Sequence, residues 1–303
     1  MTRVFIDGAA GTTGLEIGER LAGRADLTLH ALDEDKRKDA DARRAALNEA
    51  DVVILCLPDE AAREAVALID NPRTRVIDAS SAHRVADGWT YGFPELGFDV
   101  ANATRVSNPG CYPTGFLALV APLVRAGLLP AHAALVVHGT SGYSGGGKAM
   151  IAEFESGGGS AHRAYALALG HKHVPEMTRH AALRVPPIFM PSVANVFRGM
   201  VIEVPLHLSQ LSRRTTGDEV RSVLDETFAD AALIRVADAD TKLIRIEDDA
   251  GSDRMTLHVF ADPAGEQMRL IATLDNLGKG ASGAAVQSLN LMIGADPLTG
   301  LAL

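Results

Sequence analysis

The sequence is poor in cysteine and has no long hydrophobic run. Only two cysteines occur among its 303 residues, in settings too different for a disulfide framework. No apolar run reaches the roughly 18 residues that a membrane-spanning helix needs. The chain enters a predicted strand at residues 3–7, without the pattern of a signal peptide. These absences argue against secreted and membrane-embedded classes, and we expect a protein of the reducing cytoplasm.

Basic residues are also fewer than acidic ones. Acidic residues exceed basic ones by 38 to 29, which gives a formal net charge of −9. A surface of that sign repels nucleic acid and anionic lipid, so we expect neither as a partner. With 47% hydrophobic and 22% charged residues, the composition is typical of a globular protein. The length suits one large or two ordinary domains with ample core.

The first chemical signal is a glycine-rich turn, residues 8–14, between a short strand and an amphipathic helix predicted at residues 15–21. Strand, glycine turn and helix in this order open a dinucleotide-binding fold. Gly8 allows the tight turn, Gly11 lets a pyrophosphate approach the backbone, and Gly14 permits close packing of helix on strand. The pyrophosphate would bind N–H groups at the helix start. The predicted cofactor-binding residues of this turn are Gly8, Gly11, Thr12, Thr13 and Gly14.

Further strands alternate with helices through the first third of the chain. Residues 52–57 are continuously apolar, as a buried parallel strand requires, and Asp59 is predicted to cap a helix at residues 60–69. Other strands are predicted at residues 27–32 and 75–79. This alternation predicts a Rossmann-like, doubly wound parallel sheet with ligands at the carboxyl ends of its strands. A nucleotide-free, flavodoxin-like sheet is the alternative, which the glycine turn disfavours.

Charged residues after the second predicted strand bear on the choice of nicotinamide cofactor. Asp33 stands where an acidic residue would bind the ribose hydroxyls of NAD. Lys36, Arg37 and Lys38 follow, and a cluster of cations suits the 2′-phosphate of NADP. A solvated surface run is the alternative. We predict NADP, bound by these three cations.

The strongest catalytic signal lies at residues 107–114. Cys111 stands just before an apolar segment that predicts a helix over residues 115–126, and Pro113 suits the first turn of a helix. The positive end of the helix dipole favours thiolate over thiol, and unpaired backbone N–H groups there can bind an oxyanion. We predict Cys111 as a nucleophile; a turn with a packed cysteine is the alternative. Cys56, inside a buried strand, is predicted to be inert.

A segment with two histidines, residues 170–176, can supply a proton-transfer group. His171 and His173 would point in opposite directions if the segment is extended. No third histidine or cysteine stands at a recognisable metal-ligand spacing, so we predict no metal. Because imidazole titrates near neutral pH, we predict one of the two as the acid–base partner of Cys111. Glu176 would orient that imidazole.

The second half of the chain predicts an α+β domain with a mainly antiparallel sheet. Residues 255–261 and 267–275 read as a hairpin, with further strands at 134–138, 191–205 and 233–246 and a helix at 218–229. The glycine-rich stretch 139–148 is predicted as a flexible loop beside the active site, with a plain solvent loop as the alternative. We predict a dinucleotide-binding domain at residues 1–110, completed by a C-terminal helix at 277–303. Residues 111–276 would form the catalytic and oligomerisation domain.

These motifs, in this order, resemble those of the N-acetyl-γ-glutamyl-phosphate reductases of arginine biosynthesis. The matching stretches are residues 8–14, 107–114, 138–142, 170–176 and 276–281, so the resemblance covers nearly the whole chain. The compact linker before Asp51 is similar to the shorter of the family's two forms. The cysteine motif is shared with aspartate-semialdehyde dehydrogenases, which are the alternative within enzymes. An NADP-binding sensor is the alternative outside them.

The resemblance implies a two-step reduction. Cys111 attacks the acyl phosphate, phosphate leaves, and NADPH reduces the resulting thioester to N-acetylglutamate 5-semialdehyde. It also implies a homodimer or homotetramer built through the antiparallel sheet. Asn276 and Lys279, in the matching tail, are predicted to contact the cofactor. Arg84, Ser141 and Arg198 are predicted to bind the substrate, an arginine being suited to a carboxylate or phosphate. Arg198 is the weaker candidate of the two arginines, with a surface cation as its alternative.

Overall fold

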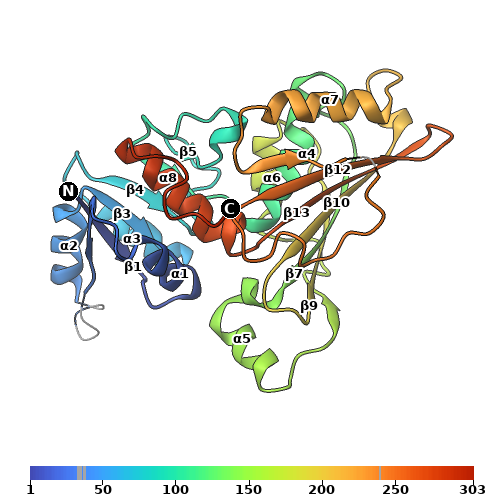
Figure 1. Ribbon diagram of the computed structural model, residues 1–303. Coiled ribbons are helices and arrows are strands. Elements are labelled where there is room, and N and C mark those ends of the chain that lie inside the picture. The colour runs from blue at the N-terminus through green and yellow to red at the C-terminus, as the bar shows by residue number, and fades with distance from the viewer. Residues whose placement is uncertain (33–35, 37–38, 239) are drawn as a thin grey trace. The chain divides into compact units, whose positions relative to one another are not determined.

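The structure, a computed structural model, describes residues 1–32, 36, 39–238 and 240–303. The chain divides into two compact units (Figure 1). Unit 1 comprises Met1–Pro109 and Ala281–Leu301, and unit 2 comprises Gly110–Gly280 with the last two residues. The chain therefore leaves unit 1 directly before Cys111. It returns within η4 (Gly278–Ser282), a π-helical turn, whereas we predicted the return at residue 277.

Unit 1 is built on a six-stranded sheet in the order β2-β1-β3-β4-β6-β5, and every described strand pair is parallel. Helices α1 and α8 pack on one face through Ile17 and Leu289, and α2 and α3 pack on the other through Leu47 and Ala62. This is the predicted doubly wound arrangement. The elements are β1 (Thr2–Asp7), α1 (Thr12–Leu21), β2 (Leu27–His30), α2 (Ala40–Glu49), β3 (Val52–Leu55), α3 (Asp59–Ala67), β4 (Arg75–Asp78), β5 (Thr90–Tyr91), η1 (Pro94–Leu96), β6 (Arg105–Ser107) and α8 (Gly283–Ile293).

One helix cap in unit 1 differs from the prediction. Pro58, not Asp59, is the N-cap of α3, and Asp59 is the first helical residue. The Asp59 carboxylate instead accepts hydrogen bonds from the backbone N–H and the hydroxyl of Ser81, at 2.8 to 2.9 Å. A contact 22 residues away in sequence thus replaces the local cap.

Unit 2 is built on a seven-stranded sheet in the order β11-β12-β13-β10-β7-β9-β8. Four of its six pairs are antiparallel, and β11–β12 and β7–β9 are parallel, so the predicted mainly antiparallel sheet is confirmed. Helix α4 packs against β10 and β13, with α6 and α7 beside it. The elements are α4 (Cys111–Arg125), β7 (Val136–Gly142), η2 (Tyr143–Gly146), α5 (Gly147–Glu155), β8 (His162–Ala164), α6 (Val174–His180), β9 (Ile188–Ala194), β10 (Met200–His207), η3 (Leu208–Gln210), α7 (Gly217–Phe228), β11 (Ile234–Val236), β12 (Met255–Ala261) and β13 (Gln267–Leu274).

Three predictions for unit 2 are wrong in detail. The predicted glycine loop at residues 139–148 is instead the end of β7, then η2 and the start of α5, because good helix formers follow its glycines at residues 148–155. The strand predicted at 191–205 is two strands, β9 and β10, separated by a turn that ends at Gly199 with a φ of +111°. Of the strand predicted at 233–246, the described residues, which exclude residue 239, form only β11.

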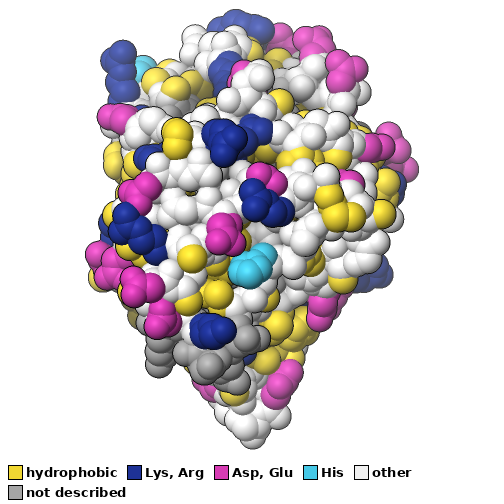
Figure 2. All heavy atoms as spheres, turned by 90° about the vertical axis from the view of Figure 1, so that its left-hand side faces the viewer, with side chains coloured by type: hydrophobic (Ala, Val, Ile, Leu, Met, Phe, Trp, Pro, Cys, Tyr) yellow, Lys and Arg dark blue, Asp and Glu magenta, His cyan; other side chains and the backbone are white. Residues whose placement is uncertain are grey.

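The surface of the molecule carries both signs of charge. Figure 2 shows acidic and basic side chains interspersed over one face, among the residues drawn in colour. Within the described part of the chain, no helix is both long enough and apolar enough to cross a membrane.

Candidate active site

Cys111 is the first residue of the 15-residue helix α4. Gly110 is the N-cap, with extended backbone and no side-chain cap, so no capping side chain stands at the first turn of the helix. Pro113 lies in this first turn, where a missing N–H costs nothing. The helix begins four residues earlier than predicted, which puts the half-buried thiol at its positive end. A thiolate and an oxyanion are both stabilised at such a place.

Glu176 holds the backbone just ahead of the nucleophile. Its Oε1 accepts the N–H of Gly110 at 2.7 Å, and the carboxylate is buried. A bond from a backbone N–H to an ionised oxygen is stronger than one between neutral groups. We predicted that Glu176 orients an imidazole; its contact in the structure fixes the start of α4.

The two histidines lie against each other. Their rings are 4.6 Å apart in an edge-on arrangement, rather than pointing in opposite directions, because the chain turns at His171 into α6. His173 is the N-cap of α6 and is buried, whereas His171 is half-buried. The His173 N–H donates to Nδ1 of His171 at 3.2 Å. A neutral His171 therefore carries its proton on Nε2.

Two tyrosines adjoin this pair, and sequence reasoning missed both. Tyr165 donates to the hydroxyl of Tyr112 at 3.3 Å, and Tyr112 donates to the carbonyl of Ser192 at 2.9 Å. Burial, together with the neighbouring Cys111, raises the pKa of Tyr112 well above its usual value and the pKa of Tyr165 to about 12. Both phenols are neutral hydrogen-bond donors at pH 7. The tyrosine directly after Cys111 was the one signal in the sequence.

The segment before α8 approaches Cys111 closely at Gly280. A Cβ added at Gly280 would lie 2.9 Å from the Cβ of Cys111, so only glycine fits there without a shift. Asn276, predicted to bind cofactor, accepts the Gly199 N–H at 3.0 Å and donates to the Ser144 hydroxyl at 2.9 Å. Lys279, also predicted there, is 2% exposed. The described bonds of Asn276 thus hold unit 2 together.

Two predicted substrate residues of unit 2 also have internal contacts. Arg198 forms a two-pronged ion pair with Asp275, at 2.5 Å from Nε and 3.2 Å from Nη2. Ser141 is buried at the end of β7 and donates to the carbonyl of Gly142 at 3.0 Å.

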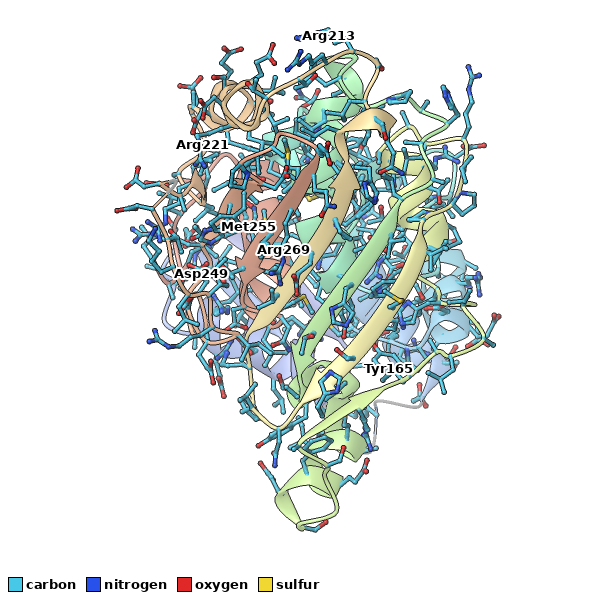
Figure 3. All side chains as sticks on the ribbon, turned by 90° about the vertical axis from the view of Figure 1, so that its right-hand side faces the viewer. Tyr165, Arg213, Arg221, Asp249, Met255 and Arg269 are labelled. Atoms are coloured by element: carbon cyan, nitrogen blue, oxygen red, sulfur yellow. The ribbon has the colours of Figure 1, made fainter. Side chains whose placement is uncertain are left out.

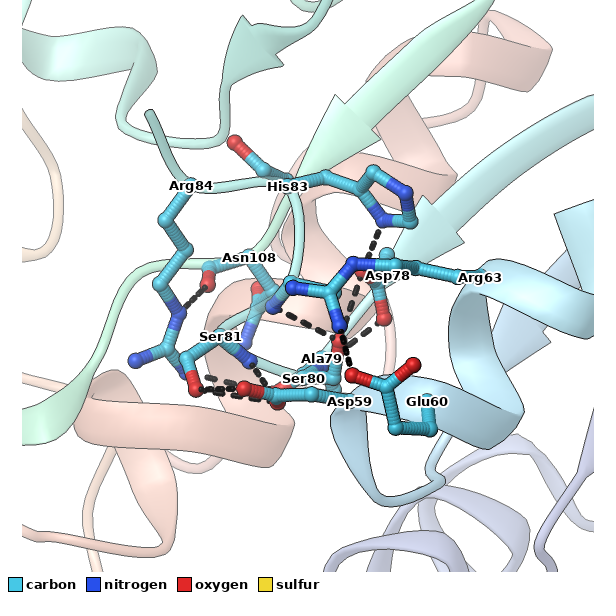
Figure 4. A network of polar contacts seen from close by, with 12 residues as sticks. Asp59, Glu60, Arg63, Asp78, Ala79, Ser80, Ser81, His83, Arg84 and Asn108 are labelled. Carbon is cyan, nitrogen blue, oxygen red and sulfur yellow. Dashed lines mark hydrogen bonds and ion pairs between the residues drawn. The ribbon is translucent and has the colours of Figure 1, made fainter. Parts of the chain in front are cut away.

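In unit 1, polar residues gather at the carboxyl ends of β4 and β6 (Figure 4). Asp78 is fully buried and accepts from the Ser80 hydroxyl at 2.8 Å, and its carboxylate lies 2.6 Å from Nδ1 of His83. Arg84 donates to the backbone carbonyls of Asn108 at 2.9 Å and Ala79 at 3.1 Å. The orientation of this predicted substrate residue is therefore fixed within unit 1.

The glycine turn of unit 1 fits the pyrophosphate of a dinucleotide. Gly8 has a φ of +89°, and a Cβ there would lie 2.3 Å from the Cys56 carbonyl oxygen. A Cβ at Gly14 would lie 2.5 Å from the backbone oxygen of Gly8, so α1 packs closely on the turn that follows β1, whereas we predicted close packing on the strand itself. Gly11 caps α1 without a side-chain bond, so N–H groups at Thr12 and Thr13 can receive phosphate oxygens.

The cations predicted for the 2′-phosphate are only partly described. Lys36 is exposed in a turn, whereas Asp33, Arg37 and Lys38 lie outside the described residues. Within the described residues, no group of three or more histidine, cysteine, aspartate or glutamate side chains is placed to hold a metal ion.

Comparison with known proteins places this fold and site in a class. Residues 3–104 match the semialdehyde dehydrogenase NAD binding domain, and residues 111–276 match the semialdehyde dehydrogenase dimerisation domain. Fold and site together thus define an oxidoreductase of the semialdehyde dehydrogenase class.

Its relatives narrow the assignment. The chain is 50% identical to the N-acetyl-gamma-glutamyl-phosphate reductase of Burkholderia lata, with 96% of each chain covered. It is 48% identical to N-acetyl-gamma-glutamyl-phosphate reductase 2 of Pseudomonas putida, covering 96% of this chain and 97% of that protein. The chain belongs to the N-acetyl-γ-glutamyl-phosphate reductase family, as its motifs predicted.

A solved structure shares the fold. Aspartate semialdehyde dehydrogenase II of Vibrio cholerae aligns with a TM-score of 0.74 at 19% identity, over 97% of this chain and 99% of that one. This likeness shows the fold alone. The predictions of fold class, of a reductase and of a nicotinamide dinucleotide cofactor are confirmed. The roles of individual site residues stay predictions.

Proposed function

We propose that the chain reduces N-acetyl-γ-glutamyl phosphate with NADPH to N-acetylglutamate 5-semialdehyde and phosphate, a step of arginine biosynthesis. The observation that carries this is Cys111 at the uncapped start of α4, in a chain closely related to reductases of that name. A thiolate at a helix start attacks acyl groups readily, because the same N–H groups stabilise the sulfur anion and the tetrahedral oxyanion.

The Cys111 sulfur attacks the acyl carbon, the bond from carbon to the phosphate oxygen breaks, and inorganic phosphate leaves. The enzyme then carries a thioester. NADPH, when bound, supplies the hydride that reduces the thioester carbon. The carbon–sulfur bond then breaks, the aldehyde leaves, and Cys111 is again a thiolate. The first-turn N–H groups of α4 stabilise the negative oxygen of both tetrahedral adducts.

Proton transfer in these steps falls to the paired histidines, which share unit 2 with Cys111. The bond to Nδ1 leaves His171 with a proton on Nε2, so a neutral His171 acts as a donor to the substrate oxygen. His173, which is buried beside it, is the second candidate for exchanging a proton with the thiol. Glu176 acts through the Gly110 backbone as a positioning residue.

The anionic ends of the substrate call for fixed cations. Arg84 lies at the carboxyl ends of the unit 1 strands, where ligands of such sheets bind, and two backbone carbonyls hold its guanidinium. We assign Arg84 to the substrate phosphate or carboxylate. Within unit 2, we assign Ser141 as a polar ligand of the substrate. Arg198 is the weaker candidate, because its guanidinium faces Asp275.

The assembly we propose is a homodimer or homotetramer built through the open face of the unit 2 sheet. Figure 3 shows this face, on which Arg269 lies. Ile188 and Met190 of β9 are 48% and 43% exposed, and Arg269 pairs with Glu203 across the strands. Exposed apolar side chains on a sheet face favour association with a second copy.

The compartment we propose is the cytoplasm. Neither described cysteine forms a disulfide, and free thiols are typical of a reducing compartment.

The test is the reverse reaction, followed as NADPH formed from NADP, phosphate and N-acetylglutamate 5-semialdehyde. Phosphate-dependent turnover that is lost in Cys111→Ser supports the proposal, and His171→Gln and His173→Gln assign the proton transfer through their pH profiles. Turnover of aspartate semialdehyde instead would move the chain to the alternative enzyme. NADP binding with no turnover of either aldehyde would favour a sensor.

A further inference from the structure

A buried carboxylate outside the predicted site organises the wall beside the nucleophile. Asp275 follows β13 directly and is fully buried. Its Oδ1 accepts the backbone N–H groups of Leu277 at 2.8 Å and Gly278 at 3.0 Å, and its Oδ2 accepts that of Gly251 at 2.5 Å. Arg198 adds its two-pronged ion pair. Five hydrogen bonds therefore converge on the two oxygens of this one buried side chain.

The turn that Asp275 organises ends against Cys111. The backbone oxygen of Asp275 accepts the N–H of Gly280 at 2.9 Å, which closes the turn from residue 275 to residue 280. Gly280 in turn lies so close to Cys111 that an added Cβ would sit 2.9 Å from the cysteine Cβ. One residue thus fixes both the start and the end of a turn whose last residue packs on the nucleophile.

We propose that Asp275 is a positioning residue for the reaction of Cys111, with Arg198 as its counter-ion rather than a substrate ligand. This inference rests on the proposed reductase function. Asp275 acts through the turn: its oxygens hold Leu277 and Gly278, and these hold Gly280 against the start of α4. Displacement of a reacting group by about 1 Å costs on the order of 100-fold in rate, so this contact matters for the chemistry.

The role predicts an effect on turnover rather than on binding. Asp275→Asn replaces Oδ2 or Oδ1 by an amide that faces Arg198 or backbone N–H groups, so part of the network is lost. We expect kcat to fall by about 100-fold with KM values for both substrates within about threefold. A residue that bound substrate would instead change KM. Loss of fold would also lower the apparent kcat at unchanged KM, so thermal melting of each variant separates it from the positioning role.

A matched control lies at the other end of the same strand. Asp262, before β13, also accepts two backbone N–H groups in a turn, those of Glu266 and Gln267 at 2.7 Å each. We expect Asp262→Asn to leave kcat unchanged. A second pair of variants tests the arginine: Arg198→Met is the test and Arg221→Met is its control. Arg221 is a suitable control because it also makes an internal contact in unit 2, donating to the Val259 carbonyl at 2.9 Å. Arg198→Met, which keeps the Asp275 carboxylate, is the second test if Asp275→Asn fails to fold.

The experiment is steady-state kinetics of the full chain and its four variants, each checked by thermal melting. Loss of kcat in the Asp275 and Arg198 variants, but not in their controls, supports the positioning role. Wild-type kcat in Asp275→Asn, or a rise in substrate KM alone in Arg198→Met, would overturn it. A wild-type protein without reductase activity would contradict the proposed function instead. In that case the rate at which iodoacetamide alkylates Cys111 decides, because an unchanged rate in Asp275→Asn contradicts the contact.

Discussion

The two cysteines of this chain are expected to differ in reactivity because their surroundings differ. Burial, with smaller contributions from the nearby carboxylates of Asp78 and Asp7, raises the pKa of Cys56 to about 12, so this thiol is protonated and unreactive. Cys111 begins a helix, where the dipole and the N–H groups favour the anion. The sequence predicted both settings, because each is local: an apolar run for Cys56, which directly follows β3, and a helix start for Cys111, whose role as nucleophile stays a prediction.

A buried histidine predicts how stability depends on pH. His258 of β12 is 7% exposed, and burial lowers its pKa below the usual value of about 6.5, although Asp249 opposes the shift. The folded state therefore disfavours the protonated ring. We expect full stability above about pH 6.5 and loss of stability as the pH falls below it. Thermal melting at a series of pH values checks this, and His258→Gln should flatten part of the slope. An equal slope in the variant would refute the assignment to His258.

At the scale of elements, sequence patterns located most strands and helices but not the contacts between them. The hairpin of β12 and β13 and the helices α1 and α7 lie within a few residues of their predicted places, because their periodicity is local. The bonds of Glu176 to Gly110 and of Asp275 to Arg198 join residues 66 and 77 positions apart. No local pattern marks such pairs, and the candidate site was therefore predicted as residues without their partners.

The close approach of η4 to α4 gives a prediction for glycine. Gly280→Ala should lower kcat at least tenfold, because its Cβ would displace Cys111, and overpacking of this kind costs about 1–3 kcal/mol. Gly18→Ala in α1 is the control, since an added Cβ there meets nothing within 4 Å. Initial rates and melting temperatures of both variants are the measurement. Full activity of Gly280→Ala would show that the contact is not needed.

The turn after β2 carries the prediction of cofactor choice. Replacing Lys36, Arg37 and Lys38 together with alanine should raise the KM for NADPH far more than that for NADH, because only NADPH carries the 2′-phosphate. Initial rates with each cofactor measure this. Equal effects on the two would remove the assignment of NADP selectivity to these cations.

At the scale of the whole molecule, the two units carry different parts of the predicted machinery. Unit 1 carries the glycine turn and unit 2 carries Cys111, the histidines and the open sheet face. The doubly wound sheet was predictable from alternating strands and helices. The strand order of unit 2, with β9 between β7 and β8, was not predictable, because pairing between distant strands leaves no mark on either one.

The open sheet face predicts an oligomer that a single charge can disrupt. Met190→Asp, in the middle of β9, should shift the assembly toward the monomer mass of 31.9 kDa, because a buried charge opposes association. Leu243→Asp, at a residue 64% exposed outside any strand, is the control and should leave the assembly intact. Light scattering measures the mass. A monomeric wild type, or an unchanged Met190→Asp assembly, would argue against this interface.

The central claim is that Cys111 carries the acyl group, and trapping that intermediate tests it most directly. Mixing the enzyme with N-acetyl-γ-glutamyl phosphate in the absence of NADPH should add one N-acetylglutamyl group, seen by intact mass spectrometry and mapped to Cys111. Addition of NADPH should then remove it and release the semialdehyde. An adduct on another residue, or phosphate release with no adduct in wild type and the same release in Cys111→Ser, would contradict the account.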